Sequence, residues 1–283
     1  MVPLPLKPKI IKQEKNKVVF EVEALYPGYG VTIGNSLRRV LLSSLPGAAI
    51  TQMKIKGVQH EFSTIPGVLE DIISIMLNLK QLRFKVFAEE PQKATLKIKG
   101  GGEEDKSSSS PSSRKRDSVK EVKGSDFELP SQVELINKSA HVATLTAKSA
   151  ELEMEILIEK GLGYQTRESR KKATPQEKLE IGVIPLDAIF TPVRKVAFRV
   201  ENMRVGERTD FDRLFLEIET DGTILPEEAF NRTNNILVSH FSLLAGVFKK
   251  EEVMPAKIEP KQKKKKIAKP KKHAKAKKRK TTK

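Results

Sequence analysis

The sequence predicts an α+β protein with mostly antiparallel sheets, and the spacing of its apolar residues carries this prediction. Many short segments alternate apolar and polar residues, the period of a strand with one buried face. The clearest is ELEMEILIE at residues 151–159. Three segments have helical periodicity instead, and few strands alternate with helices of crossover length. A doubly wound parallel fold is therefore disfavoured.

The other expected strands follow the same alternation with less contrast between their two faces. Each has apolar residues at every second position, which predicts burial on one side only. These segments are residues 17–25, 49–57, 82–88, 94–100, 193–201 and 214–222.

Three expected helices break the strand pattern. The first begins near Gly34 or Asn35 and runs to Leu45, where Pro46 and Gly47 end it. Its apolar stripe is Leu37, Val40, Leu41 and Leu45, which leaves Arg38 and Arg39 off the stripe.

The second expected helix, residues 66–80, is apolar nearly all round and has acids in its first turns. The third runs from Pro226 to about Lys250, and its apolar residues recur every seven positions. Such a stripe is wide enough to cover a sheet and also to meet another helix.

Composition bounds the class of protein. The chain has 283 residues, 38% of them hydrophobic, which is enough to bury a core in one or two domains. The absence of cysteine excludes disulfides and thiolate chemistry. The apolar runs are too short to cross a bilayer or to form a signal peptide, so a cytoplasmic location is expected.

The net charge of +17 is concentrated at one end of the sequence. Residues 254–283 contain a single acid, Glu259, and the lysine-rich run KQKKKK, whereas the rest of the chain is close to balanced. Like charges repel and few apolar residues are present, so this tail is expected to be disordered. The segment from Gly100 to Ser118, rich in glycine, serine and charge, predicts a flexible surface loop.

A glycine-rich turn, YPGYGVTIG, lies between an expected strand and the first helix. Such a turn can bind phosphate through free backbone N–H groups. However, Gly28, Gly30 and Gly34 have the spacing G-x-G-x-x-x-G, and the following strand brings no acid for a ribose. The phosphate interpretation is therefore disfavoured, and a surface that holds another protein is the alternative.

No catalytic or metal-binding pattern emerges from the side chains. The four histidines are isolated from one another in the sequence. Asp210 and Asp212 could bind Mg²⁺ or cap a turn, but their arginine neighbours favour a structural ion-pair network. The chain is therefore predicted to have no active site and no bound metal or cofactor of its own.

The remaining features indicate association with other proteins. Arginine is favoured at interfaces because its planar fork pairs with carboxylates while its stem packs on apolar groups. Arg38 and Arg39 could serve this purpose or could lie on a solvated helix face.

Four blocks of the sequence carry a resemblance to a known family. The blocks are YGVTIGNSLRRVLLSSLPGAAIT, GVQHEFSTIPGVLEDIISIMLNLKQL, EKGLGYQTRESR and VGERTDFDRLFLEIETDGTILPEEAF. In order and spacing they resemble the N-terminal region of the bacterial DNA-directed RNA polymerase alpha subunit family, over about residues 8–250.

This resemblance implies two structural parts and a role in assembly. Residues 1–47 and 182–253 would form a dimerisation domain with a helical pairing surface, and residues 48–181 a β-rich inserted domain. Two copies would pair, and the dimer would be the platform for the beta and beta-prime subunits. The active site and its Mg²⁺ would lie in those large subunits, so the chain would belong to a nucleotidyltransferase complex without catalysing the reaction itself.

The resemblance also assigns roles to particular residues. The contact with the large subunits would centre on Arg39, with Arg38, Leu42 and Lys80 contributing. Gly34 and Asn35 match the family motif and are expected to shape the turn and the helix cap. The dimer interface would consist of Phe230, Thr233, Leu237, His240, Phe241 and Leu244.

The end of the sequence departs from the family pattern, which continues into a small helical domain that contacts DNA. We expect the lysine-rich tail to supply DNA affinity that does not depend on sequence and falls steeply with salt. Two other readings stay open, a free-standing basic architectural protein and a nucleotide-dependent enzyme that uses the glycine turn. A bacterial cytosol is favoured over a plastid stroma.

Overall fold

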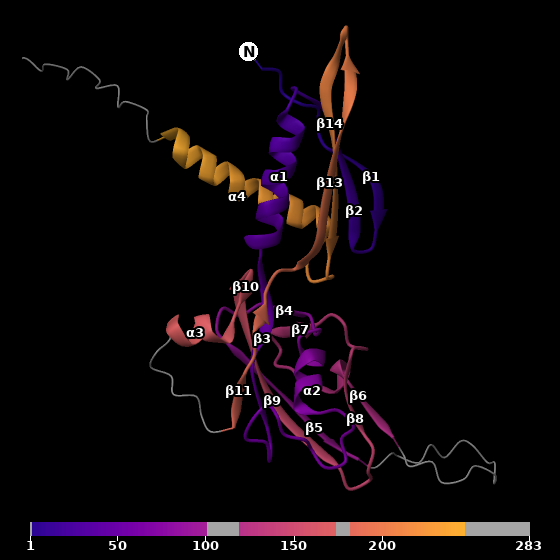
Figure 1. Ribbon diagram of the computed structural model, residues 1–283, viewed down its shortest axis with the longest axis vertical. Coiled ribbons are helices and arrows are strands. Elements are labelled where there is room, and N and C mark those ends of the chain that lie inside the picture. Colours follow the sequence, from indigo (N-terminus) through magenta and orange to yellow (C-terminus); the bar gives the residue numbers. More distant parts are fainter. Residues whose placement is uncertain (1, 101–118, 174–181, 247–283) are drawn as a thin grey trace, which may run out of the picture. The chain divides into compact units, whose positions relative to one another are not determined.

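The computed structural model describes residues 2–100, 119–173 and 182–246, which form antiparallel sheets and helices (Figure 1). All strand pairings in this described part are antiparallel. The predicted α+β class is therefore confirmed. The expected loop, apart from Gly100, and the whole lysine-rich tail lie outside the described residues.

The first sheet has four strands in the order β1, β2, β14, β13. Alternation on β14 buries Leu214, Leu216 and Ile218 on one face, against α1 and the start of α4. The strands are β1 (Lys9–Glu14), β2 (Lys17–Leu25), β13 (Val193–Val205) and β14 (Arg208–Thr220).

The second sheet has six strands, in the order β5, β9, β3, β4, β7, with β11 also paired to β3. The strand predicted at residues 151–159 is β9, and its alternation buries Leu152, Met154, Ile156 and Ile158. The strands are β3 (Pro46–Ile55), β4 (Phe84–Val86), β5 (Gln92–Lys99), β7 (Val133–Leu135), β9 (Glu151–Leu162) and β11 (Val183–Pro185).

Two short strand pairs and four helices complete the described residues. The pairs are β6 (Lys120–Lys123) with β8 (His141–Leu145), and β10 (Tyr164–Gln165) with β12 (Ala188–Ile189). A 3-10 turn spans Gly124–Asp126. The helices are α1 (Tyr29–Ser43), α2 (Ile72–Leu79), α3 (Arg167–Ala173) and α4 (Pro226–Gly246).

Two large groups of buried apolar side chains hold these elements together. The group around the six-stranded sheet draws on residues between 50 and 186 and includes Ile72, Ile75 and Leu79 of α2. The group around the four-stranded sheet draws on residues 18–45 and 193–230, and it joins α1 to the first half of α4. Ile184 and Leu186 belong to the first group, so the predicted domain boundary near residue 181 does not separate the two groups.

The domain boundaries themselves stay a prediction. The contacts of the chain divide it into two units, Met1–Ser242 and Leu243–Lys283. Of the second unit, only residues 243–246, the last residues of α4, are described.

Two helices begin at other residues than the sequence predicts. Helix α1 begins at Tyr29, before the expected start at Gly34, so Gly34 and Asn35 are interior residues and not a turn or cap. Helix α2 begins at Ile72 and not near Pro66, because the carboxylate of Asp71 caps it by accepting a hydrogen bond from the Ser74 amide.

Candidate functional site

The glycine turn before α1 is occupied by a carboxylate of the same chain. Gly28 precedes the helix with φ 83°, a left-handed conformation that glycine adopts without strain, and it has no side chain to cap the helix. Instead, Asp212 Oδ2 on β14 accepts hydrogen bonds from the amides of Gly28 at 2.9 Å and Gly30 at 3.0 Å. Asp212 thus takes the position that a bound phosphate would need.

The predicted ion-pair network around this turn is confirmed for Asp210 and not for Asp212. Arg208 donates two hydrogen bonds to Asp210, and these bonds lower the pKa of Asp210. Arg208 also lies over the rings of Tyr26 and Phe211, which pack edge to face. Asp212, in contrast, makes no ion pair within the described residues.

Gly30 and Gly34 allow α1 to lie close against β13, which Figure 1 shows alongside the helix. A Cβ atom on Gly34 would lie 2.7 Å from the ring of Phe198, and one on Gly30 would lie 2.8 Å from Val200. Both distances are too short for carbon atoms. The glycines therefore serve close helix–sheet packing and not ligand binding.

The opposite face of α1 is exposed and carries the predicted docking residues. Leu37 and Leu41 are buried as expected, whereas Arg38, Arg39 and Leu42 are exposed. Among the described residues, neither guanidinium has an ion pair or a hydrogen bond, and α1 itself contains no acid. These two arginines are therefore available for carboxylates of another chain.

The hydroxyl groups on α1 are already engaged within the helix. Thr32 donates to the Gly28 carbonyl, Ser36 to the Thr32 carbonyl and Ser43 to the Arg39 carbonyl. The strongest free hydrogen-bonding groups on the exposed face are thus the two guanidiniums, with apolar Val31 and Leu42 beside them along the helix.

Lys80, the other predicted docking residue, lies at the end of α2 in a separate charged cluster. Its Nζ is 3.4 Å from Asp187 Oδ2, while Asp187 Oδ1 accepts a hydrogen bond from the Arg167 amide at 2.9 Å. The hydrogen bond from the Arg167 amide lowers the pKa of Asp187 most, and the positive charge of Lys80 lowers it further. No hydrogen bond or ion pair in the described part of the chain joins Lys80 to α1.

The predicted dimer residues on α4 fall into two groups. Phe230 stacks on Phe20 with ring centroids 4.6 Å apart, and Thr233 is fully buried. Leu237 is partly buried against the same apolar group. His240 and Phe241 are exposed, as is Leu244 further along the helix. The heptad pattern did not separate the half of α4 that packs on the sheet from the exposed half.

His141 lies beside two glutamates that could not be connected with it from the sequence, because the three residues are distant in the chain. His141 Nε2 lies 2.9 Å from Glu70 Oε1, and its Nδ1 lies 3.2 Å from Glu121 Oε1. Glu70 also accepts hydrogen bonds from the amide and hydroxyl of Thr144, and these bonds lower its pKa despite partial burial. Within the described ranges, no group of three or more such side chains is arranged to hold a metal ion.

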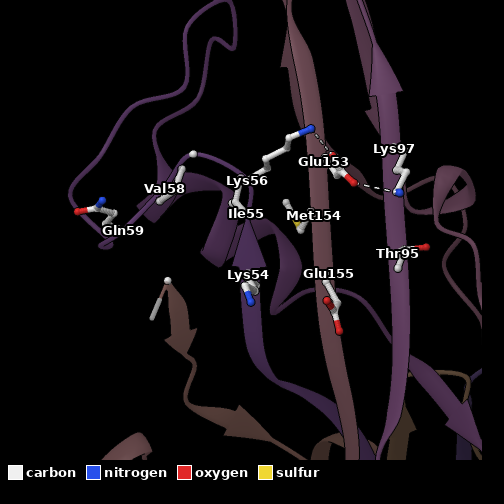
Figure 2. Close-up of a pocket in the computed structure, with 12 residues that line it drawn as sticks. Lys54, Ile55, Lys56, Val58, Gln59, Thr95, Lys97, Glu153, Met154 and Glu155 are labelled. Carbon is white, nitrogen blue, oxygen red and sulfur yellow. Dashed lines mark hydrogen bonds and ion pairs between the residues drawn. The ribbon is translucent and has the colours of Figure 1, made fainter. Parts of the chain in front are cut away.

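An open groove of about 590 Å³ lies on the outer face of the six-stranded sheet (Figure 2). Figure 2 shows the Glu153 carboxylate between Lys56 and Lys97. Its Oε2 lies 2.9 Å from the Nζ of Lys56, and its Oε1 lies 3.0 Å from the Nζ of Lys97. The hydrogen bonds from these two lysines lower the pKa of Glu153 to about 2. The opposite charges neutralise one another, so the groove is best explained as a cross-strand charge ladder.

None of the helices in the described ranges is both long and apolar enough to span a membrane.

Comparison with known proteins agrees with the resemblance seen in the sequence. A family model described as the RNA polymerase Rpb3/RpoA insert domain matches residues 53–191. The chain is 44% identical over 237 residues to the DNA-directed RNA polymerase subunit alpha of Roseiflexus sp. (strain RS-1), which covers 84% of this chain and 66% of the relative. It is 42% identical over 245 residues to the same subunit of Oceanobacillus iheyensis, with 85% and 71% covered.

A third relative extends this pattern. The subunit alpha of Herpetosiphon aurantiacus is 46% identical over 226 residues, which cover 80% of this chain and 61% of the relative. The chain thus spans less than two thirds of the Roseiflexus and Herpetosiphon relatives. With this identity across most of its residues, the chain belongs to the bacterial DNA-directed RNA polymerase alpha subunit family.

Proposed function

We propose that the chain is a non-catalytic assembly subunit of DNA-directed RNA polymerase, whose α1 binds the large subunits. The observation that carries this proposal is the exposed face of α1. Arg38 and Arg39 have no partner among the described residues, while the opposite face of the helix is fixed by Leu37 and Leu41. Arginine is enriched among the residues that dominate binding at protein interfaces, so a helix that presents two unpaired arginines fits a docking surface, and exposed Leu42 adds apolar area beside them.

Each docking residue has a distinct role in this proposal. Arg39 is the central anchor and pairs with a carboxylate of the beta subunit, Arg38 extends that contact, and Leu42 fills an apolar pocket one turn further along. Lys80 makes a second contact with the large subunits, for which it must exchange or share its ion pair with Asp187.

Two copies of the chain pair through α4 in the proposed assembly. The exposure of Val238 and Phe241 supports this pairing. The two large apolar residues lie one helical turn apart, and neighbouring exposed apolar side chains often mark a surface that binds another protein. Phe230 and Thr233 are buried within the chain itself, so they would hold α4 in place and would not contact the second copy. Residues further along α4 would form the contact with that copy.

In this proposal the chain itself does not catalyse the reaction or bind the metal, and both functions belong to other subunits of the complex. The polymerising site and its Mg²⁺ lie in the large subunits, DNA is bound by the complex, and the setting is the bacterial cytoplasm. The lysine-rich tail, which lies outside the described residues, adds DNA affinity in this proposal. The alternative of a free-standing architectural protein is not supported, because the relatives described above bear the name of a polymerase subunit.

The proposal is tested by the substitution Arg39→Ala in the full chain. We expect the affinity for the beta subunit to fall by about 2 kcal/mol, because a central interface arginine is lost. Light scattering should still report a dimer, and the thermal midpoint should stay unchanged, since Arg39 is exposed and its guanidinium makes no ion pair or hydrogen bond with the described residues.

The control is Arg199→Ala, which removes another exposed arginine, on β13, together with its ion pair to Glu201 and its contact with the ring of Phe215. It should bind the beta subunit like the wild type. If Arg39→Ala also binds like the wild type, α1 is not the docking surface. A loss of the dimer in Arg39→Ala would instead assign this arginine to the fold.

A further inference from the structure

Asp212 is a buried carboxylate whose partners are backbone amides of another element. Its exposed fraction is 7%, and its two hydrogen bonds come from the amides of Gly28 and Gly30, which are distant from it in the sequence. Within the residues that the structure describes, no cation pairs with it. Its charge is therefore balanced by the free N–H groups and the positive end of the α1 dipole.

The sheet fixes where this carboxylate lies. Asp212 pairs with Asn202 of β13 on one side and with Leu25 of β2 on the other. The register with β2 shifts between Asp212 and Leu214, an irregularity of the kind that redirects side chains. Because strands on both sides hold the backbone here, Asp212 is a rigid reference point for the start of α1.

Next to this point, the contact surface of α1 consists of Gly30 and Gly34, with Ile33 between them packed on apolar residues of β2 and β14. Gly30 and Gly34 face β13 without side chains, so their contacts with Val200 and Phe198 set the distance between helix and sheet. A smooth glycine surface limits sliding and rotation less well than interdigitated side chains do. The two amide hydrogen bonds to Asp212 add a directional restraint at this end of the helix to the packing of Ile33.

We infer that Asp212 is a positioning residue for the docking face of α1. It fixes the residue at which the helix begins and thereby the direction in which Arg38, Arg39 and Leu42 point. A slip of one residue would turn the helix face by about 100°, and Arg39 lies only about 13 Å along the axis from Gly30. This inference rests on the proposed function, since it concerns the same docking face.

The test compares Asp212→Ala and Asp212→Asn with the wild-type chain in binding to the beta subunit. We expect Asp212→Ala to bind about five- to tenfold more weakly, the size of effect that follows from loss of a helix cap. Asp212→Asn keeps the shape and one acceptor oxygen, so it should retain more affinity than Asp212→Ala. Should Asp212→Ala fail to fold, the comparison of Asp212→Asn with the wild type decides.

A control of equal stability separates positioning from general destabilisation. Leu152 is fully buried on β9, in the apolar group around the six-stranded sheet, which includes no residue of α1. Leu152→Val or Leu152→Ala, whichever matches the thermal midpoint of the Asp212 variant, should bind the beta subunit like the wild type. Amide exchange at Gly30 should be faster in the Asp212 variants and unchanged in the Leu152 control.

Two results would overturn the inference: wild-type affinity in the Asp212 variants, or an equal loss of affinity in the Leu152 control. Arg39→Ala, measured in the same assay, keeps this inference distinct from the proposed function. If Arg39→Ala weakens binding and the Asp212 variants do not, only the positioning role is wrong. If Arg39→Ala has no effect either, the docking surface itself is wrong.

Discussion

The N-termini of α1 and α2 both have a carboxylate that accepts hydrogen bonds from free backbone amides, but the two carboxylates come from different places in the chain. Helix α2 is capped by its own neighbour, because Asp71 accepts a hydrogen bond from the Ser74 amide at 2.8 Å. Helix α1 is preceded by a glycine without a capping side chain, and the distant Asp212 replaces the cap. A local cap depends only on residues next to the helix, whereas a remote cap ties the helix to the sheet that carries it.

The remote cap also explains how α1 tolerates its glycines. Glycine inside a helix costs about 1 kcal/mol relative to alanine, and α1 contains Gly30 and Gly34 in its interior. Close packing on Phe198 and Val200 and the two bonds to Asp212 offset this cost. The glycines of α1 thus belong to a structure whose stability comes from tertiary contacts.

The largest effect should come from the middles of the two helices, where we expect no difference between them. Leu41 of α1 and Ile75 of α2 are both fully buried, so Leu41→Ala and Ile75→Ala should each lower the free energy of unfolding by about 3 kcal/mol. Denaturant titration measures both. The adjacent Leu42→Ala, which removes an exposed side chain, is the control and should change stability little. A large loss in Leu42→Ala would contradict the assignment of the exposed face.

The caps should differ more than the middles. Asp212→Ala leaves the amide of buried Gly30 and that of exposed Gly28 without this acceptor, so we expect a loss of about 2 kcal/mol in the free energy of unfolding. Asp71→Ala removes an exposed cap whose amide can bond to water instead, so its loss should be smaller. Thermal or denaturant unfolding gives the order of the two variants. The reverse order would break the comparison.

The smallest effect concerns the pH dependence of the α2 cap. Hydrogen bonds from Ser74 lower the pKa of Asp71 below its usual value of 3.8. A lowered pKa in the folded state means that the cap stabilises α2 fully above about pH 3.8 and is lost as the pH falls through the lower, folded value. The amide chemical shift of Ser74, followed by NMR, should titrate with a midpoint below 3.8. A midpoint above 3.8 would contradict the cap.

Local patterns allowed much of the fold to be predicted. The alternation of residues 151–159 gave β9 and its buried side chains, because a period of two depends only on neighbouring residues. The buried and exposed faces of α1 followed equally from helical periodicity, so Arg38 and Arg39 could be assigned to the exposed side.

Features that depend on distant residues could not be predicted in this way. The early start of α1 depends on Asp212, and the environment of His141 depends on Glu70 and Glu121. On α4 the heptad pattern continues from the half that packs on the sheet into the half that is exposed, so periodicity alone could not mark the change at Leu237.

The central claim, that the exposed arginines of α1 meet a polymerase subunit, is tested most directly by chemical labelling. The free chain and the assembled polymerase would each be treated with phenylglyoxal, which modifies accessible guanidiniums, and the labelled sites identified by mass spectrometry. Our account predicts that Arg38 and Arg39 react in the free chain and are protected in the polymerase, whereas Arg199 reacts in both. Equal labelling of Arg38 and Arg39 in the two states would contradict it.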